Sequence, residues 1–213
     1  HNPTTISMGA NRRKDIVDVC NKRNVPIVED GVYTLGASPN LPPLVTLAPD
    51  RVFHVKSLSK SLSPGLRLGV LVLPSGWEEH AEEALRALPL SSSPVDYALL
   101  EEWFTSGVME TVRGTLRAEA RQRAKLARSF FDNRTIITDD CAFHAWLPMP
   151  HTEAEAFEKA AATLGVVVTE PDAVRADRND NATGIRLCLG GLGMEDLTTG
   201  LTLLSRLKIG DHS

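Results

Sequence analysis

The sequence predicts an α/β fold with a mostly parallel sheet, followed along the chain by a small α+β unit. In the first half, apolar segments of strand length alternate with segments of helical spacing, and continuous apolar strands are typical of parallel sheets. In the last third, short apolar segments alternate with amphipathic ones. This change of pattern indicates a second unit of about 80 residues, within the usual size range of a domain.

The first half alternates helix and strand. Ile16, Val17 and Val19 recur at helical spacing among charged residues, and a short apolar run after them predicts a buried strand that ends at two acidic residues. A long segment rich in Pro and Gly then predicts a loop. The predicted elements are a helix at 8–24, a strand at 25–28, a loop at 31–49, strands at 51–55 and 68–73, and between these two a helical turn after Lys60 that ends at Pro64.

The pattern from 77 to 131 is helical, with breaks predicted at Pro89, Pro94 and Gly107. Alanine and arginine are frequent in the last part of this region, which favours a single long helix over 108–131. Beyond that helix we expect strands at 135–138, 142–147, 166–168 and 185–189, and helices at 152–164 and 194–207.

The composition is that of an ordinary globular protein, with 42% hydrophobic and 23% charged residues. No apolar run approaches the ~20 residues that span a bilayer, so we expect no membrane partner. The net charge of −4 argues against nucleic-acid binding by this segment itself. Three widely spaced cysteines, Cys20, Cys141 and Cys188, predict neither a disulfide framework nor a zinc site, and favour a cytoplasmic location.

The most informative stretch is SLSKSLSPGLRLG at residues 57–69, which places Lys60 among serines and Arg67 after a Pro-Gly turn. A lysine amine can form an imine with an aldehyde cofactor. The hydroxyls of Ser57 and Ser59 and the guanidinium of Arg67 match the oxygens of a phosphate. Together they predict a site for pyridoxal 5'-phosphate. The alternative is an exposed lysine in a solvated, serine-rich loop.

Two further positions suit the same cofactor. Asp30 ends a buried strand, where α/β sheets bind ligands, and its carboxylate could keep a pyridine nitrogen protonated. Tyr33 lies three residues later and could hydrogen-bond the phenolic oxygen of the ring. The alternative is that Asp30 only caps a turn beside Gly31, a frequent role of Asp in that setting.

Arg186 lies within an apolar strand segment, GIRLCL, near the end of the chain. Its guanidinium either extends to water at a sheet edge or binds the carboxylate of an amino acid. No metal site is predicted, because His151 and Glu155 are four residues apart at a helix start without a third ligand.

These motifs, in this order, resemble the class I/II aminotransferase family of fold-type-I pyridoxal-phosphate enzymes. The resemblance covers nearly the whole chain. Its motifs are Asn2-Pro3-Thr4, Asp30-x-x-Tyr33, Ser57-x-Ser59-Lys60, Pro64-Gly65-Leu66-Arg67-Leu68-Gly69 and Arg186.

The resemblance implies a role for each motif. Lys60 would be the catalytic lysine. Asn2 would contact the cofactor's ring oxygen and, with Arg186, the substrate carboxylate. The implied cofactor-binding residues are Asn2, Asp30, Tyr33, Ser57, Ser59, Lys60 and Arg67. It also implies that residues 1–105 are the C-terminal part of a large cofactor-binding domain, that 106–134 form an interdomain helix, and that 135–213 form a small α+β domain.

Within that family the chain is most similar to the aminotransferase-like domain of MocR-type regulators of the GntR superfamily. This similarity implies a domain that senses an amino compound or the cofactor itself through an imine on Lys60, in a homodimer that binds DNA through a separate N-terminal domain. The alternative is a metabolic aminotransferase that moves an amino group between an amino acid and a 2-oxo acid, so the sequence leaves enzymatic activity open.

The start of the chain departs from the family pattern. Thr5 stands where many aminotransferases have glycine, and His1 opens the chain on a turn signal. We therefore expect a C-terminal fragment that lacks the aromatic residue and second phosphate loop of the family's N-terminal half. By itself such a fragment is expected to bind the cofactor weakly or not at all, and not to transaminate.

Overall fold

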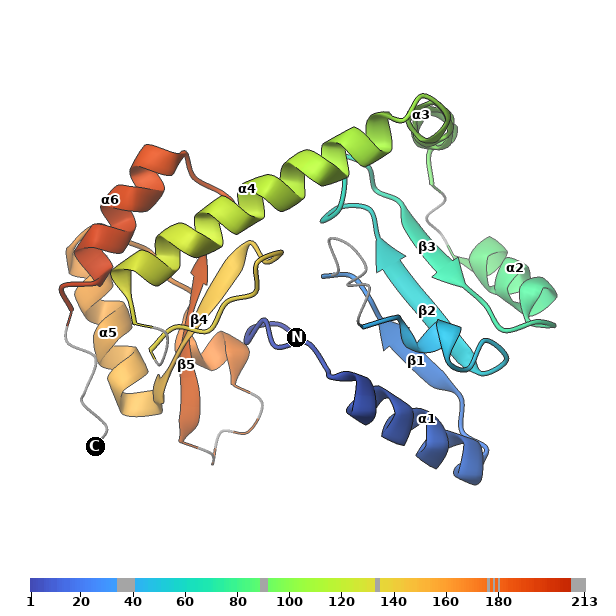
Figure 1. The fold of residues 1–213 in the computed structure, drawn as a ribbon, viewed down its shortest axis with the longest axis horizontal. Helices are drawn as coiled ribbons and strands as arrows, with labels where there is room; N and C mark the ends of the chain where they lie inside the picture. The colour runs from blue at the N-terminus through green and yellow to red at the C-terminus, as the bar shows by residue number, and fades with distance from the viewer. Residues whose placement is uncertain are drawn as a thin grey trace. The chain divides into compact units, whose positions relative to one another are not determined.

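The computed structural model describes residues 1–33, 41–88, 92–132, 135–175, 177, 179 and 181–207. The chain divides into two compact units (Figure 1). One unit consists of residues 8–116, and the other of residues 117–213 together with residues 1–7. The division falls within one helix, α4 (Val108–Phe130).

The 8–116 unit contains a three-stranded sheet in the order β1-β2-β3, formed by Ile27–Asp30, Val52–Ser57 and Gly69–Val72. β1 and β2 are parallel, whereas β3 runs antiparallel to β2. The expected mostly parallel sheet is therefore mixed. A parallel partner needs a crossover of a dozen or more residues, usually a helix, whereas residues 58–68 connect β2 to β3 by turns alone.

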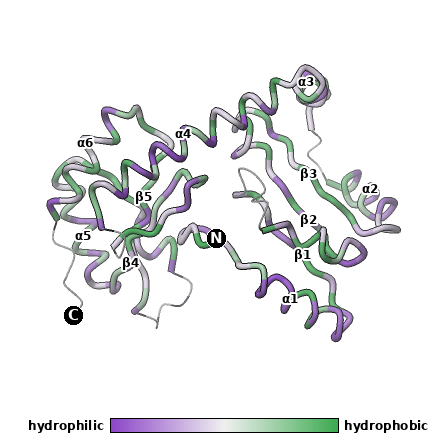
Figure 2. Tube along the Cα trace, in the orientation of Figure 1, coloured by the Kyte–Doolittle hydropathy of each residue, from purple (hydrophilic) through white to green (hydrophobic). Residues whose placement is uncertain are grey.

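One face of this sheet is covered by α1 (Ala10–Arg23). Val17 of the helix packs with Ile27 and Val52 of the sheet, together with Leu44 and Ala48. Leu44 begins the short 3-10 helix η1 (Leu44–Thr46). Figure 2 shows hydrophilic residues along much of α1 and hydrophobic residues along β3. Burial of apolar area between the helix and the sheet holds this layer together.

Three helices follow the sheet: α2 (Glu78–Ala87), α3 (Pro94–Thr105) and α4. Pro94 is the first residue of α3, where a missing N–H costs nothing, and the Ser93 hydroxyl oxygen accepts a hydrogen bond from the amide of Val95. Gly107 precedes α4 with a φ of 77°, in the left-handed region that favours glycine. The breaks predicted at Pro94 and Gly107 and the single long helix after them are confirmed, whereas Pro89 lies outside the described residues.

In the 117–213 unit, β4 (His144–Pro150) pairs with β5 (Ala182–Cys188) in an antiparallel two-stranded sheet. α5 (His151–Thr163) and α6 (Met194–Leu204) pack their buried side chains on it, and the 3-10 helix η2 (Pro171–Val174) lies between α5 and β5 in the sequence. The core includes Leu147, Phe157, Ile185, Leu189 and Leu201. Among the described residues, no helix has the length and apolar character needed to cross a membrane.

Two strands predicted for this unit are wrong. Residues 135–138 form only an isolated bridge, in which Ile137 and Trp146 exchange backbone hydrogen bonds of 2.8 Å. Residues 166–168 form no strand, because the amide of Val166 bonds back to the carbonyl of Ala161 at the end of α5. Val167 is 94% exposed. Val166 and Val168, on either side of it, pack against the core of this unit. The apolar run of three β-branched residues therefore reflects core packing, not strand pairing.

Candidate functional site

The candidate residues of the 8–116 unit gather at one edge of the sheet. Asp30 is the last residue of β1 and Ser57 the last residue of β2, and parallel strands end at the same edge. Arg67 lies two residues before β3, whose first residue Gly69 pairs with Ser57. The sheet therefore brings Asp30, the lysine loop (residues 57–68) and Arg67 to one side, and the antiparallel direction of β3 is what places Arg67 there.

Four leucines hold the lysine loop on the unit. Leu58, Leu62, Leu66 and Leu68 are buried, and they pack against partly buried side chains from α3 and α4, namely Leu100, Trp103, Met109 and Val112. Lys60 and Arg67, which lie between these leucines in the sequence, are exposed. The alternation of leucine with polar residues thus fixes which side of the loop meets water.

Backbone and hydroxyl hydrogen bonds close the loop. The amide of Leu62 donates to the carbonyl of Leu58 at 2.8 Å, and the amide of Leu58 donates to the carbonyl of Leu68 at 3.2 Å. Ser57 Oγ accepts from the amide of Ser59 at 3.1 Å. The Ser57 hydroxyl can still donate, since a hydroxyl has one donor hydrogen and two acceptor lone pairs. Ser61, at the centre of the loop, is 2% exposed and bonds to the Ser57 carbonyl.

Lys60 and Tyr33 approach each other across the edge. Lys60 Nζ lies 5.9 Å from the centroid of the Tyr33 ring, within the range of a cation–π contact. Both residues are exposed, so Lys60 lies at the surface of the described unit. The exposure agrees with the alternative of a solvated lysine, but the buried leucines distinguish this loop from an ordinary surface loop.

Asp30 forms the turn that the alternative interpretation predicts. Its Oδ1 accepts a hydrogen bond of 2.9 Å from the amide of Val32. The side chain is exposed, and one oxygen of a carboxylate suffices for this turn. The turn role and the cofactor role of Asp30 are therefore compatible.

The donor set of the lysine loop fits a phosphate-bearing aldehyde. Within the described part of the chain, Arg67 has no hydrogen bond or ion pair and Lys60 has no acidic partner. Two cations and the Ser57 hydroxyl in one closed loop provide donors for an anion. The Ser59 hydroxyl lies in the same loop and donates to the Leu66 carbonyl at 3.5 Å. The carboxylate of Asp30 at the same edge suits a protonated ring nitrogen. These residues fit pyridoxal phosphate. Over the described residues, no group of three His, Cys, Asp or Glu side chains is placed to hold a metal ion.

Arg186 belongs to the other unit, where it lies in β5 opposite Trp146 of β4. Its side chain is half-buried, and its Nε is buried without a hydrogen-bond partner among the described residues. A buried donor without an acceptor is costly, so the Nε end of this guanidinium is not solvated. Of the two interpretations of Arg186, the buried Nε favours an absent acceptor such as a carboxylate.

Asn2 and Thr5 lie in the same unit as Arg186. Asn2 is exposed. Thr5 is 7% exposed and has a φ of 59°, in the left-handed region. A β-branched residue adopts that region only with strain. The glycine that many aminotransferases have at this position matches the backbone conformation found here.

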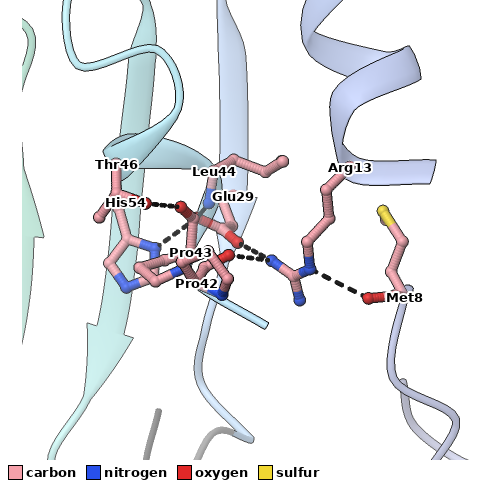
Figure 3. A network of polar contacts seen from close by, with 8 residues as sticks. All are labelled: Met8, Arg13, Glu29, Pro42, Pro43, Leu44, Thr46 and His54. Atoms are coloured by element: carbon pink, nitrogen blue, oxygen red, sulfur yellow. Dashed lines mark hydrogen bonds and ion pairs between the residues drawn. The ribbon is translucent and has the colours of Figure 1, made fainter. Parts of the chain in front are cut away.

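The sequence did not reveal two charge networks, one centred on the partly buried Glu29 and one on the buried Arg123. Glu29 bonds to Arg13 of α1 and to His54 of β2 (Figure 3). Arg123 of α4 donates to the carbonyls of Leu189 and Leu192, which follow β5. In the sequence, the Glu29 network is indicated only by an acid and a histidine in neighbouring strand segments. The Arg123 contacts are indicated only by an arginine among alanines in the helical segment.

The chain is similar to known proteins over nearly its whole length. The family model described as "Aminotransferase class I and II" matches residues 1–204. The chain is 33% identical over 210 residues to the HTH-type transcriptional regulator YdeF of Bacillus subtilis, covering 97% of this chain and 45% of YdeF. It is 26% identical over 203 residues to PtsJ of Salmonella typhimurium, a vitamin B6 salvage pathway transcriptional repressor, covering 93% of this chain and 46% of PtsJ.

Among solved structures, the chain resembles LysN, the α-aminoadipate aminotransferase of Thermus thermophilus, in complex with N-(5'-phosphopyridoxyl)-L-leucine. The TM-score is 0.75 at 25% identity, and the match covers 96% of this chain and 55% of LysN. The chain thus spans about half the length of the proteins it matches. The family model covers nearly the whole chain, and the fold agrees with that of a solved member. This chain therefore belongs to the aminotransferase class I and II family.

Proposed function

We propose that this chain is the pyridoxal-phosphate-binding, aminotransferase-like part of a MocR-type transcriptional regulator, which senses an amino compound or the cofactor itself. The names of YdeF and PtsJ support the regulator, and that of PtsJ supports a link to vitamin B6. The family normally binds pyridoxal phosphate. DNA contact would be made by a separate winged-helix domain in a cytoplasmic homodimer.

Each candidate residue has a role in this proposal. Lys60 provides the amine that anchors the cofactor covalently, and Arg67 with the Ser57 and Ser59 hydroxyls holds its phosphate. The Asp30 carboxylate keeps a proton on the ring nitrogen, and the Tyr33 hydroxyl donates to the phenolic oxygen of the ring. When bound, the cofactor supplies an aldehyde and an electron-accepting ring.

Two further residues would recognise the ligand. Arg186 can form two parallel hydrogen bonds to a carboxylate, which would satisfy its buried Nε. Asn2 would donate from its side-chain amide to the cofactor's ring oxygen and to the same carboxylate. If the protein catalyses amino transfer, the Lys60 amine would also accept and return the proton at the substrate's Cα.

One observation supports the proposal more than any other: buried leucines and backbone hydrogen bonds hold a loop whose exposed side chains include a lysine and an arginine among serines. An ordinary solvated loop needs no such anchoring. The loop lies at the strand ends, where α/β sheets bind ligands, beside a carboxylate at the end of the parallel neighbour.

The test is covalent trapping. The protein at its full natural length is incubated with pyridoxal phosphate, reduced with borohydride and digested with a protease. The masses of the peptides are then measured by mass spectrometry. We expect the phosphopyridoxyl group on the peptide that contains Lys60. Lys60→Arg should abolish it, whereas the matched change Lys125→Arg in α4 should leave it in place. A reduced adduct spread over surface lysines, or none, would contradict the assignment.

The second candidate, a metabolic aminotransferase, is favoured by the likeness to LysN. The two functions differ in the response to a bound amino compound. A regulator would change its affinity for DNA when the compound binds, and an enzyme would release a 2-oxo acid with every turnover. Measuring both responses with the same panel of amino acids separates them.

A further inference from the structure

Glu29 lies next to Asp30 in β1 and is the centre of a polar network (Figure 3). Its Oε1 accepts from Arg13 Nη1 at 3.0 Å, and its Oε2 accepts from the amide of Leu44 at 2.8 Å. His54 Nδ1 lies 2.9 Å from the same Oε2. The side chains of Arg13, Glu29 and His54 are only 16%, 13% and 14% exposed. The network is therefore largely removed from water.

Glu29 and Asp30 point to opposite faces of the sheet, because side chains alternate along a strand. Glu29 shares its face with Ile27, which packs under α1, whereas Asp30 belongs to the other face. Glu29 therefore does not reach the side on which Asp30 would meet a ligand. Any influence of Glu29 on Asp30 passes through the backbone that joins them.

The same network fixes the chain on both sides of the loop that leaves β1. The chain leaves the strand at Asp30 and returns at Leu44, whose amide donates to the Glu29 carboxylate. Arg13, which holds the other carboxylate oxygen, also donates to the carbonyl of Pro42 at 3.2 Å. The Arg13–Glu29 pair thus links the end of β1 to the segment at Pro42 and Leu44.

The turn that carries the Asp30 carboxylate packs against the His54 ring. A Cβ on Gly31 would lie 2.8 Å from His54 Cε1 and 3.1 Å from the Val55 carbonyl oxygen, so a larger residue here would displace the His54 ring. The Gly31 amide donates to that carbonyl at 2.8 Å, and the next amide, of Val32, donates to Asp30 Oδ1. A rotation of His54 would change the space that this turn occupies.

Stability alone does not account for a network of this kind. Replacing a buried ion pair by well-packed apolar residues is often neutral or stabilising, since charges lose hydration on burial. The charges provide directional contact instead: one carboxylate defines the positions of a helix, two strands and a returning segment at once. Such geometry matters most where a neighbouring side chain must hold a fixed direction.

We propose that Glu29 is a positioning residue for Asp30: held by Arg13 and His54, it fixes the Asp30–Val32 turn and so directs the Asp30 carboxylate toward the ring nitrogen of the bound cofactor. The inference rests on the proposed function for its ligand, but the positioning itself is a property of the chain. The two can be tested separately.

The first experiment needs no cofactor. In the protein at its full natural length, Glu29→Gln keeps the shape of the side chain and removes its charge. We expect the amides of Gly31 and Val32 to exchange hydrogen about tenfold faster or more, the order expected when a charged hydrogen-bond partner is lost. The control is Val17→Ala, which weakens the apolar packing of α1 on the same face without touching Glu29. It should lower the melting temperature without this local increase in exchange.

The second experiment uses the absorption spectrum of bound pyridoxal phosphate and its dependence on pH. Asp30→Asn should change the spectrum, and Glu29→Gln should change it in the same direction. If Glu29 acts through Asp30, adding Glu29→Gln to Asp30→Asn should change little more. Val17→Ala should leave the spectrum as in the wild type.

The outcomes distinguish the two ideas. Unchanged exchange at Gly31 and Val32 in Glu29→Gln, or the same local increase in Val17→Ala, would overturn the positioning role whatever the cofactor does. Fully additive spectral effects of Glu29→Gln and Asp30→Asn would also overturn it. If Glu29→Gln shows the predicted faster exchange but the wild-type protein binds no cofactor, the proposed function would instead be overturned, and Glu29 would remain a positioning residue of the turn alone.

Discussion

Cys141 and Cys188 differ in ways that alkylation can detect. Burial raises the pKa of the Cys141 thiol, and the nearby Asp139 carboxylate raises it further against the opposing effect of Arg121. Cys188 is exposed. Because the thiolate is the reactive form, we expect iodoacetamide to modify Cys141 more slowly than Cys188 at pH 8. The difference should narrow as the pH rises through the raised pKa of Cys141.

The same shift has a consequence for stability. The raised pKa means that the folded protein favours the neutral thiol, so this contribution is fully present below the pKa of the unfolded state. It is lost as the pH rises through the pKa of the folded state. Mass spectrometry of the two cysteine peptides over a pH series measures the reaction directly, and a faster reaction at Cys141 throughout would contradict the burial that raises its pKa.

Arg186 is expected to cost stability. Its buried Nε lacks a partner among the described residues, while its neighbours in β5 are apolar and buried. Arg186→Met should therefore raise the free energy of unfolding by about 1 kcal/mol, at the lower end of the cost of an unsatisfied buried group. The same change should abolish stabilisation by amino acids. Urea unfolding with and without amino acid measures both effects, and a destabilised variant would argue for a structural arginine.

At the scale of the element, α4 contains a glycine that serves no visible purpose. Gly114 lies in the helix interior, and a Cβ built on it meets nothing within 4 Å. Gly114→Ala should stabilise the protein by about 0.5–1 kcal/mol, because alanine loses less backbone freedom in a helix. Gly107→Ala, at a φ of 77° before the same helix, should destabilise it. Thermal unfolding followed by circular dichroism tests the pair, and equal effects would contradict the argument.

Elements with strong local signals could be predicted from the sequence. The glycine and proline at the ends of α3 and α4 defined those helices, since these residues act on their own backbone. The predicted strand at 135–138 failed because strand formation depends on a partner, and there only the backbone of Ile137 pairs with β4, while Thr138 bonds to it through its hydroxyl. The antiparallel direction of β3 likewise depends on the connection rather than on β3's own residues.

The same contrast holds for the site. The placement of Asp30 and Ser57 at one edge could be predicted, because both end neighbouring parallel strands. The placement of Arg67 at the same edge could not, because it depends on the antiparallel direction of β3. The contacts of Glu29 could not, since Arg13 is 16 residues and His54 25 residues away in sequence. Contacts between residues so far apart in sequence depend on the register of β1 against β2 and on where α1 packs on the sheet, which no local pattern defines.

At the scale of the whole molecule, one face of the β1-β2-β3 sheet stands out. α1 covers the face that bears Ile27 and Val52. On the opposite face, which bears Asp30, Val28 is 72% exposed and Leu71 is 47% exposed. Sheets with parallel strands are normally covered on both faces, and large exposed apolar patches mark association sites. The 213-residue chain spans 45% of the length of YdeF.

We therefore expect the 213-residue chain to associate with itself and to bind an apolar dye as its concentration rises. Val28→Thr should reduce both effects, because threonine keeps the strand propensity while adding a hydroxyl to the exposed face. The matched change Val19→Thr should have little effect, since Val19 is 58% exposed but lies on the hydrophilic helix α1. Sedimentation velocity and dye fluorescence measure the two responses. A chain that stays monomeric and binds no dye, or equal effects of the two threonine variants, would show that this face of the sheet does not drive association. That result would hold even though the face carries exposed valine and leucine beside the Asp30 carboxylate that is proposed to contact the cofactor.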